Sequence, residues 1–386
     1  MTDTIRIGII ATGNMGRAHV RCVNALEGAE VAAIADSDAE MLKRGLEAVG
    51  REVPAYDDYR RILDDPAIDA VVISLPNDLH ADAAVAALDA GKHVLCEKPM
   101  ATALADCDRM IAAGKKGSGS LFAEHPQGPQ EKGTRPPFPV LQIGLELRCA
   151  PNYRELKRLI AAGEIGRLHM LWCHEFRDPF YPKVDDWIVK RARSGGTLVE
   201  KDCHHFDLFN WLADSPPVRV TGFGGSDAVY ADGGENPLRR GLWRDLSHPD
   251  TRMDVLDNAW VIVEYENHAR ACLGLCMFTS HGKDGLVLGA IGAQGQLVSA
   301  ERRYEIEQYP PDGDTPTIHR PTIADADKQF SHRGAVLFEH RAFLAAIRDG
   351  APLPVTPQEA RLSIAVALAA ERAVAEKRVV EIAEIS

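Results

Sequence analysis

The chain has 386 residues, of which 45% are hydrophobic and 26% charged, and its formal net charge is −12. This length predicts two domains with cores of their own. The acidic balance argues against a nucleic-acid-binding protein, and no apolar run reaches the ~18 residues of a membrane span. The eight cysteines form no C-x-x-C pair, so no zinc site or disulfide framework is indicated and we expect a reduced, cytoplasmic protein.

Short apolar strands alternate with amphipathic helices in the first ~120 residues, a pattern typical of a parallel sheet covered by helices on both faces. The sequence therefore predicts a doubly wound Rossmann domain, of fold class α/β. The expected strands are residues 5–10, 31–35, 70–74 and 93–95, and the expected helices are residues 16–26, 39–49, 81–90 and 103–115.

The first strand runs into the segment ATGNMG, close to the dinucleotide fingerprint G-x-G-x-x-G. Ala11 replaces the first glycine, Gly13 lets the backbone approach a pyrophosphate, and Gly16 lets the helix pack closely on the strand. Asp36 ends the second strand, where a carboxylate binds the ribose hydroxyls, and no arginine follows it to receive a 2′-phosphate. We therefore expect NAD as the cofactor, bound here by Ala11, Thr12, Gly13, Asn14, Met15 and Asp36. The alternative is a phosphate-free turn in which Asp36 caps a helix.

Two further segments end neighbouring strands, where ligands of open α/β sheets bind. They are S-L-P-N-D-L-H at residues 74–80 and E-K-P at residues 97–99. Lys98 follows a strand end, and Glu97 is placed to hold its ammonium group. The alternative for Lys98 is the commoner one of a surface lysine. These segments add Ser74, Leu75, Pro76, Asn77, His80, Glu97 and Lys98 to the expected cofactor site.

Residues 1–147 are the expected NAD-binding domain, with a loop insertion at 118–139 that is rich in glycine and proline. A strand at 140–147 and a helix at 151–162 follow. Residues 148–386 form the expected α+β substrate-binding and oligomerisation domain, with a large, mostly antiparallel sheet. Its helical tail, 338–378, is expected to pack back on the first domain. Its expected strands are 168–176, 218–223, 259–266, 270–278 and 286–291, with a hairpin turn at Asn267 and His268.

The segment G-G-T-L-V-E-K-D-C-H-H-F-D carries the candidate base. If it forms one helix, Glu200, His204 and Asp207 share a face, and Glu200 orients the imidazole of His204 and raises its basicity. The adjacent histidines invite a metal site, but no third ligand follows at helical spacing, so we expect no metal. We interpret His205 as a surface or interface residue.

Together these segments resemble the Gfo/Idh/MocA (glucose–fructose oxidoreductase/inositol dehydrogenase) family over nearly the whole chain, including residues 148–153, 195–211 and Asp257. The resemblance implies that Lys98 contacts both the nicotinamide ribose and the substrate hydroxyl, and that the Lys98–Pro99 peptide is cis. It also implies that His204 is the base. Many relatives have D-x-G-x-H here, whereas this chain has Glu200 for the aspartate and Asp202 for the glycine.

The substrate site is expected where aromatic and basic side chains gather after the first long strand of the second domain, because rings stack on sugars and donors bind their hydroxyls. The cluster of basic side chains would also bind an anionic group of the substrate. The alternative is that these side chains are a run of solvated charges without a binding role. His332, in a loop before the last helices, is a further candidate for this site. The expected substrate-binding residues, with Arg148 and Tyr153 taken from the family position, are Arg148, Tyr153, Arg177, Tyr181, Lys183, Trp187, Lys190, Arg191 and His204.

These observations favour an NAD-dependent oxidoreductase acting on a secondary alcohol of a sugar, sugar acid or cyclitol, with Lys98, His204 and Glu200 as catalytic residues. The alternative is a redox glycosidase that retains NAD+ and cleaves a glycoside, for example an anionic sulfoquinovoside. A third hypothesis, a non-catalytic NAD-binding regulator, does not require Lys98 and His204. The expected partners are a small carbohydrate and a second or further copy of the chain, in a homodimer or homotetramer, with no nucleic acid and no membrane.

Overall fold

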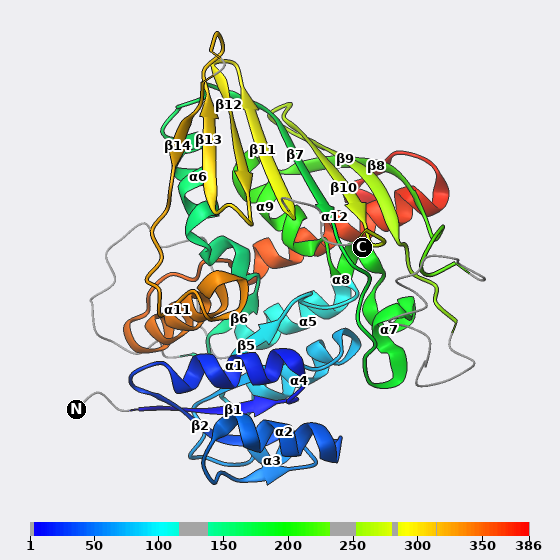
Figure 1. Ribbon diagram of the computed structural model, residues 1–386. Helices are drawn as coiled ribbons and strands as arrows, with labels where there is room; N and C mark the ends of the chain where they lie inside the picture. Colours follow the sequence, from blue (N-terminus) through cyan, green and yellow to red (C-terminus); the bar gives the residue numbers. More distant parts are fainter. Residues whose placement is uncertain (1–3, 116–137, 232–251, 280–284, 314, 386) are drawn as a thin grey trace. The chain divides into compact units, whose positions relative to one another are not determined.

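The computed structural model describes residues 4–115, 138–231, 252–279, 285–313 and 315–385 (Figure 1). The chain divides into two compact units. The first comprises Met1–Ala101, Ala105–Ala150 and Ile323–Arg361, and the second comprises Thr102–Leu104, Pro151–Thr322 and Leu362–Ser386. The expected insertion at 118–139 lies almost entirely outside the described residues. Within the described ranges, no helix combines the length and the hydropathy needed to cross a bilayer.

The first unit is built on a parallel sheet with the strand order β3-β2-β1-β4-β5-β6. This is the strand order of the Rossmann fold, so the predicted fold of the N-terminal region is confirmed. Its strands are β1 (Ile5–Ile10), β2 (Ala29–Ala35), β3 (Ala55–Tyr56), β4 (Ala70–Ile73), β5 (His93–Glu97) and β6 (Leu141–Gly144). Its helices are α1 (Asn14–Asn24), α2 (Ala39–Val49), α3 (Arg60–Leu63), α4 (His80–Asp89), α5 (Leu104–Lys115) and α11 (Ala335–Asp349).

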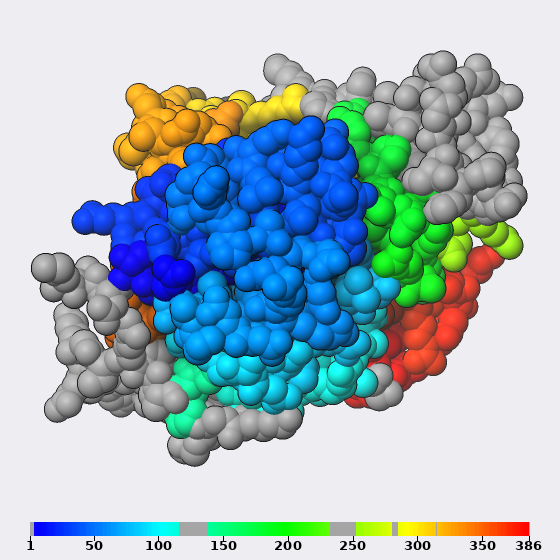
Figure 2. All heavy atoms as spheres, turned by 90° about the horizontal axis from the view of Figure 1, so that it is seen from below, coloured from blue at the N-terminus to red at the C-terminus, as the bar shows by residue number. Residues whose placement is uncertain are grey.

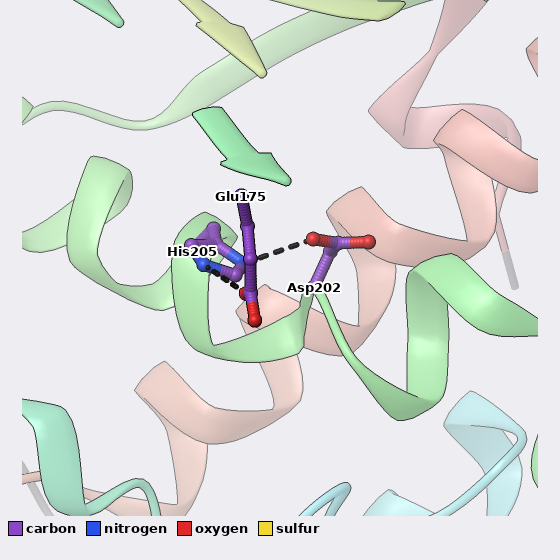
Figure 3. Close-up of side chains that lie close together, drawn as sticks. All are labelled: Glu175, Asp202 and His205. Carbon is purple, nitrogen blue, oxygen red and sulfur yellow. Dashed lines mark ion pairs between the residues drawn. The ribbon is translucent and has the colours of Figure 1, made fainter. Parts of the chain in front are cut away.

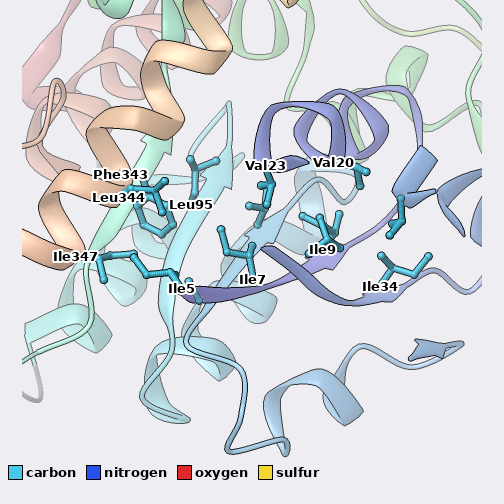
Figure 4. Close-up of a cluster of buried hydrophobic side chains, with 14 residues drawn as sticks. Ile5, Ile7, Ile9, Val20, Val23, Ile34, Leu95, Phe343, Leu344 and Ile347 are labelled. Carbon is cyan, nitrogen blue, oxygen red and sulfur yellow. The ribbon is translucent and has the colours of Figure 1, made fainter. Parts of the chain in front are cut away.

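The core of this unit lies on both faces of β1, as the continuous apolar run of that strand predicts. Alternate isoleucines of β1 point to one face, where they pack against α1 and α11 (Figure 4). Gly8 points to the other face, where a Cβ atom would lie 2.4 Å from Ile62 of α3. Complete burial of one such isoleucine stabilises the fold by roughly 1.5–3 kcal/mol. In Figure 2 the blue atoms of the N-terminal segment form the face that is turned toward the viewer.

The second unit holds a sheet with the order β14-β13-β12-β11-β7-β10-β9-β8-β15, in which only the β7–β10 pair is parallel. The predicted mostly antiparallel sheet is therefore confirmed. Its strands are β7 (Leu168–Phe176), β8 (Pro217–Gly225), β9 (Asn258–Tyr265), β10 (Arg270–Cys276), β11 (Leu286–Gly292), β12 (Gly295–Ala300), β13 (Glu305–Tyr309), β14 (Thr317–His319) and β15 (Val380–Glu381). Its helices are α6 (Pro151–Ala161), α7 (Arg191–Ser194), α8 (Thr197–Glu200), α9 (Cys203–Ala213) and most of α12 (Pro357–Glu376).

The two faces of this second sheet differ in character. α6 packs against β12 and β13, and α9 packs against β7, so these helices cover one face. The other, which we call the outer sheet face, carries large apolar side chains that remain accessible, including Phe223 (74% exposed) and Trp260 (58% exposed). Its apolar and aromatic residues are Met170, Trp172, His174, Phe176, Phe223, Trp260 and Ile262.

The first turn of α1 yields a stability prediction. A Cβ atom on Gly16 would lie 2.0 Å from the carbonyl oxygen of Ala11, whereas one on Gly13 would meet no atom within 4 Å. We expect Gly16→Ala to lower the free energy of unfolding by roughly 1–3 kcal/mol, because overpacking forces the helix off the strand. The matched control, Gly13→Ala, should change it by less than about 0.5 kcal/mol. Urea denaturation measures both, and equal midpoints for the two variants would contradict the prediction.

Candidate active site

The turn between β1 and α1 is fixed by the carboxylate of Asp36, which directly follows β2. Ala11 has φ = 66°, in the left-handed region that favours glycine, so the alanine retains the backbone of the missing glycine. The N–H of Thr12 donates to Asp36 Oδ2 at 2.7 Å, and the N–H of Asp38 donates to Oδ1 at 2.9 Å. The first turn of α1 has no side-chain cap and no acidic residue. The amide groups at the start of this helix therefore form a site for a phosphate.

The expected alternative for Asp36, a helix cap, does not describe this turn. The residue that caps α2 is Asp38, whose Oδ1 accepts a hydrogen bond from the N–H of Met41 at 2.9 Å. Asp36 instead connects the turn after β1 with the turn after β2, because it accepts hydrogen bonds from Thr12 and Asp38. In a fold of this kind a carboxylate at the end of the second strand binds the ribose hydroxyl groups, and for Asp36 this role stays a prediction.

The two motifs that follow β4 and β5 are joined by one histidine. Nε2 of His80 lies 2.8 Å from the carbonyl oxygen of Leu75, and its Nδ1 lies 2.8 Å from that of Pro99. Burial is the main reason that the pKa of His80 is lowered. The ring is 1% exposed, so His80 positions the two segments. Ser74, in the first segment, has a buried Oγ without a hydrogen-bond partner among the described residues, which fits a group that a bound nucleotide would supply.

Glu97 anchors the segment that carries Lys98. Its Oε2 accepts from the backbone N–H of Lys98 at 3.1 Å, and its Oε1 lies 3.0 Å from Nε2 of His19. Nδ1 of His19 in turn lies 2.8 Å from Nε2 of His340. Burial opposes ionisation of Glu97, but the hydrogen bond to His19 and the charges of His19 and Lys98 outweigh it and lower its pKa. The Lys98–Pro99 peptide is cis, as the family resemblance implies.

Two more carboxyl groups lie near Glu97 in the interior of the first unit. Burial is the main reason that the pKa values of Glu146 and Glu339 are raised. Nε2 of His332 lies 3.5 Å from Oε1 of Glu146. The loop residue that was expected to approach the site is therefore next to a buried carboxyl group of the first unit. Sequence reasoning did not identify Glu146, Glu339, His19 or His340, because none of them falls in a local motif.

The segment that carries His204 is not one helix. α8 ends at Glu200 and α9 begins at Cys203, so the expected continuous helix is wrong at this point. The chain still turns helically between them, because the N–H of Lys201 donates to the carbonyl oxygen of Thr197 at 2.8 Å and that of Asp202 to Leu198 at 3.2 Å. Glu200 and His204 are both buried, at 8% and 5% exposure. His204 belongs to the second unit and Lys98 to the first, so their convergence on one hydroxyl stays a prediction.

His205 is fully buried, and its interpretation as a surface or interface residue is wrong. Its Nε2 lies 3.0 Å from Oε2 of Glu175, and its Nδ1 lies 2.9 Å from Oδ1 of Asp202 (Figure 3). Burial alone would lower the pKa of His205, but the hydrogen bonds to Asp202 and Glu175 raise it to about 9. Lys201 and Arg177 also pair with Oε1 of Glu175, at 3.1 and 3.2 Å. His205 is therefore an imidazolium ion at neutral pH.

Several basic residues expected to bind substrate already have partners. Arg191 pairs with buried Glu371 at 3.0 Å, and Nζ of Lys190 donates to the carbonyl oxygen of Asp185 at 2.6 Å. Trp187 and Lys183 are half-buried, whereas Tyr181 is 55% exposed. Arg191 and Lys190, both expected to bind substrate, therefore already have partners within the protein.

The two residues taken from the family position are both buried in the structure. The side chain of Arg148 is 2% exposed and pairs with Glu359 at 2.6 Å, both within the first unit. Tyr153 is 1% exposed, and its hydroxyl has no partner among the described residues. Contact of either residue with a substrate stays a prediction.

The loop after β8 is fixed by a residue to which we assigned no role in the site. Asp257, at 0% exposure, accepts hydrogen bonds from the backbone N–H groups of residues 227–230, at 2.7–3.3 Å. This places Tyr230, whose hydroxyl accepts from the N–H of Phe180 at 2.8 Å and whose ring stacks on that of Phe180. The aromatic loop that contains Tyr181 is thereby tied to β8 and β9.

The fold and the sites at its strand ends define a two-domain oxidoreductase with an NAD-binding Rossmann domain. The family model described as the oxidoreductase family with an NAD-binding Rossmann fold matches residues 5–125. The model of the C-terminal α/β domain of that oxidoreductase family matches residues 157–382. The chain belongs to the Gfo/Idh/MocA oxidoreductase family, and NAD is its cofactor.

Relatives and solved structures agree with this assignment. The myo-inositol 2-dehydrogenase of Thermotoga maritima is 25% identical over 387 residues, which cover 99% of each chain. An inositol 2-dehydrogenase of Saccharopolyspora erythraea is 30% identical over 293 residues, covering 75% of this chain and 72% of that protein. A levoglucosan dehydrogenase in complex with NADH and levoglucosan has the same fold, with a TM-score of 0.79 at 21% identity over 98% of this chain and 99% of that one.

The carboxylate of Asp36 yields a prediction on cofactor choice. Asp36→Asn retains an oxygen that accepts from the N–H of Thr12 but removes the charge that repels a 2′-phosphate. We expect the ratio of the dissociation constants for NADPH and NADH to fall by about tenfold or more. Quenching of protein fluorescence on titration with each nucleotide measures it. Asp38→Asn, at the cap of α2, is the matched control, and an unchanged ratio in Asp36→Asn would refute a ribose-facing role.

Proposed function

We propose that this chain is an NAD-dependent dehydrogenase that oxidises a secondary alcohol of a cyclitol, sugar or sugar acid. The observation that carries the proposal is the position of Lys98, directly after β5 at the carboxyl edge of the NAD-binding sheet. The inositol and levoglucosan dehydrogenases that resemble the chain support a polyhydroxylated substrate. When bound, NAD supplies the hydride acceptor, and the protein provides geometry, charge and proton transfer.

Three side chains have proposed roles in this reaction. His204 accepts the hydroxyl proton, and Lys98 stabilises the negative charge that develops on the oxygen. Glu200, four residues before His204, orients its imidazole ring across the junction of α8 and α9. Arg177, Tyr181, Lys183, Trp187, Lys190 and Arg191 follow β7, in the segment that we propose binds the substrate.

A self-associated form is the second part of the proposal. Phe223 and Trp260 are exposed on neighbouring strands β8 and β9, where Phe223 is the register partner of Trp260. A contiguous apolar surface of this kind is a protein–protein contact in most soluble proteins. A second copy of the chain would cover it in a homodimer or homotetramer. All eight cysteines lie in the described residues and none of them forms a disulfide there, which fits the reducing cytoplasm.

The catalytic proposal predicts separate effects on turnover and on nucleotide binding. Lys98→Met and His204→Asn should each lower kcat about 100-fold or more, because each removes one group that acts in the transition state. NADH affinity should change less than about threefold in His204→Asn. NADH formation on myo-inositol, levoglucosan and a sulfoquinovoside measures turnover, and Lys43→Met and His268→Asn are the matched controls. Unchanged kcat in either active-site variant refutes the roles, and aglycone release without NADH points to the glycosidase instead.

The assembly proposal predicts dissociation when charge enters the outer sheet face. Trp260→Glu should shift the chain toward the monomer, since an unpaired carboxylate would be buried in the interface. Sedimentation velocity over a concentration series measures the change. Lys43→Glu, an exposed substitution on α2 of the first unit, should leave the mass unchanged. A wild-type protein that sediments as a monomer at all concentrations would overturn this part of the proposal.

A further inference from the structure

Glu175 connects the sheet of the second unit with the turn that precedes the candidate base. It is the penultimate residue of β7, where its register partners are Leu275 of β10 and Leu286 of β11. Its carboxylate pairs with Lys201, in the turn between α8 and α9, at 3.1 Å, and with His205, on the first turn of α9, at 3.0 Å. One buried carboxylate thus holds both sides of the segment that carries His204.

The negative charge of Glu175 is balanced by ion pairs and is not removed by protonation. Burial opposes ionisation of Glu175, but Lys201, His205 and Arg177 outweigh it and hold its pKa well below the usual range. A charge-assisted hydrogen bond in a buried place is strong and fixes geometry, because water does not compete for either partner. The turn at Lys201 and the start of α9 therefore have one favoured arrangement.

A bound metal is the competing explanation for this cluster. Ligand atoms of Glu175, Asp202 and His205 all lie within 4.8 Å of one another (Figure 3). However, each ring nitrogen of His205 faces a carboxylate oxygen, and Lys201 and Arg177 already occupy Oε1 of Glu175. A divalent cation would enter beside two fixed positive charges, which raises its free energy. The arrangement favours an internal network of ion pairs.

We propose that Glu175 is a positioning residue for His204, and that the opposite charges of Glu175 and His205 set the electrostatic environment in which His204 exchanges its proton. His205 directly follows His204 in α9, so contacts that fix the backbone at His205 also restrict the backbone at His204. The inference rests on the proposed role of His204 as the base.

The expected effects on the reaction have opposite signs. Activity that needs a neutral His204 rises with pH through the pKa of that histidine. This rise is the acidic limb of the pH profile of kcat/KM. Removal of the negative charge in Glu175→Gln disfavours the imidazolium form of His204 and should move this limb to lower pH. Removal of the positive charge in His205→Asn should move it to higher pH. Each shift should be about half a pH unit to one unit, the size expected when one charge is removed from a partly buried site.

The experiment is the pH profile of kcat/KM for the wild type, Glu175→Gln, Glu175→Asp and His205→Asn, with KM for NAD+ and thermal unfolding recorded for each. Glu175→Asp retains the charge but shortens the side chain, so kcat should fall while the limb remains near its wild-type pH. Glu264→Gln is the matched control, because Glu264 also lies in a strand of this sheet and pairs with two arginines, Arg219 and Arg270. If Glu175→Gln does not fold, His205→Asn decides the matter.

Two results would overturn the inference. One is a loss of activity in both charge-removing variants with the limb at its wild-type pH, which indicates a structural role alone. The other is one equivalent of a transition metal in the purified enzyme whose removal by a chelator abolishes activity. Failure of the proposed function gives a different result, because His204→Asn would then retain a wild-type limb and turnover.

Discussion

Each segment of the candidate site is held by a buried or half-buried carboxylate that has partners inside the protein. Asp36 holds the glycine turn, Glu97 holds the segment that carries Lys98, Glu175 holds the turn before His204, and Asp257 holds the loop after β8. A buried charge without partners costs several kcal/mol, so each carboxylate fixes the conformation that supplies its donors. These contacts thereby fix the conformation of the loops at the strand ends.

The elements of the first unit could be predicted because their signals are local. β1 and α2 have the expected bounds, since an apolar run buried on both faces and an amphipathic period each lie within one short window. The strands β12, β13 and β14 were not predicted. Their residues are polar on one face, and they form because β11 extends a sheet edge to which they pair, a contact that no short window contains.

The residues of the motifs could be found from the sequence, but their partners could not. His19 lies 78 residues from Glu97 and 321 residues from His340, so only the tertiary fold brings the two rings and the carboxylate together. His205 is different, because a signal was present. Asp202 precedes it by three residues, a spacing that brings side chains together on a helix.

The carboxyl groups around Lys98 have a consequence for the charge that this lysine can offer. An ionised Glu97 favours the ammonium form of Lys98, which is the form that the proposed reaction requires for a developing alkoxide. Three ionised carboxylates would instead surround the alkoxide with negative charge and oppose its formation. Burial raises the pKa values of Glu146 and Glu339, whereas the hydrogen bond to His19 and nearby positive charges lower that of Glu97, so Glu97 ionises most readily of the three. His19 accounts for part of this difference, because its Nε2 lies 3.0 Å from Oε1 of Glu97.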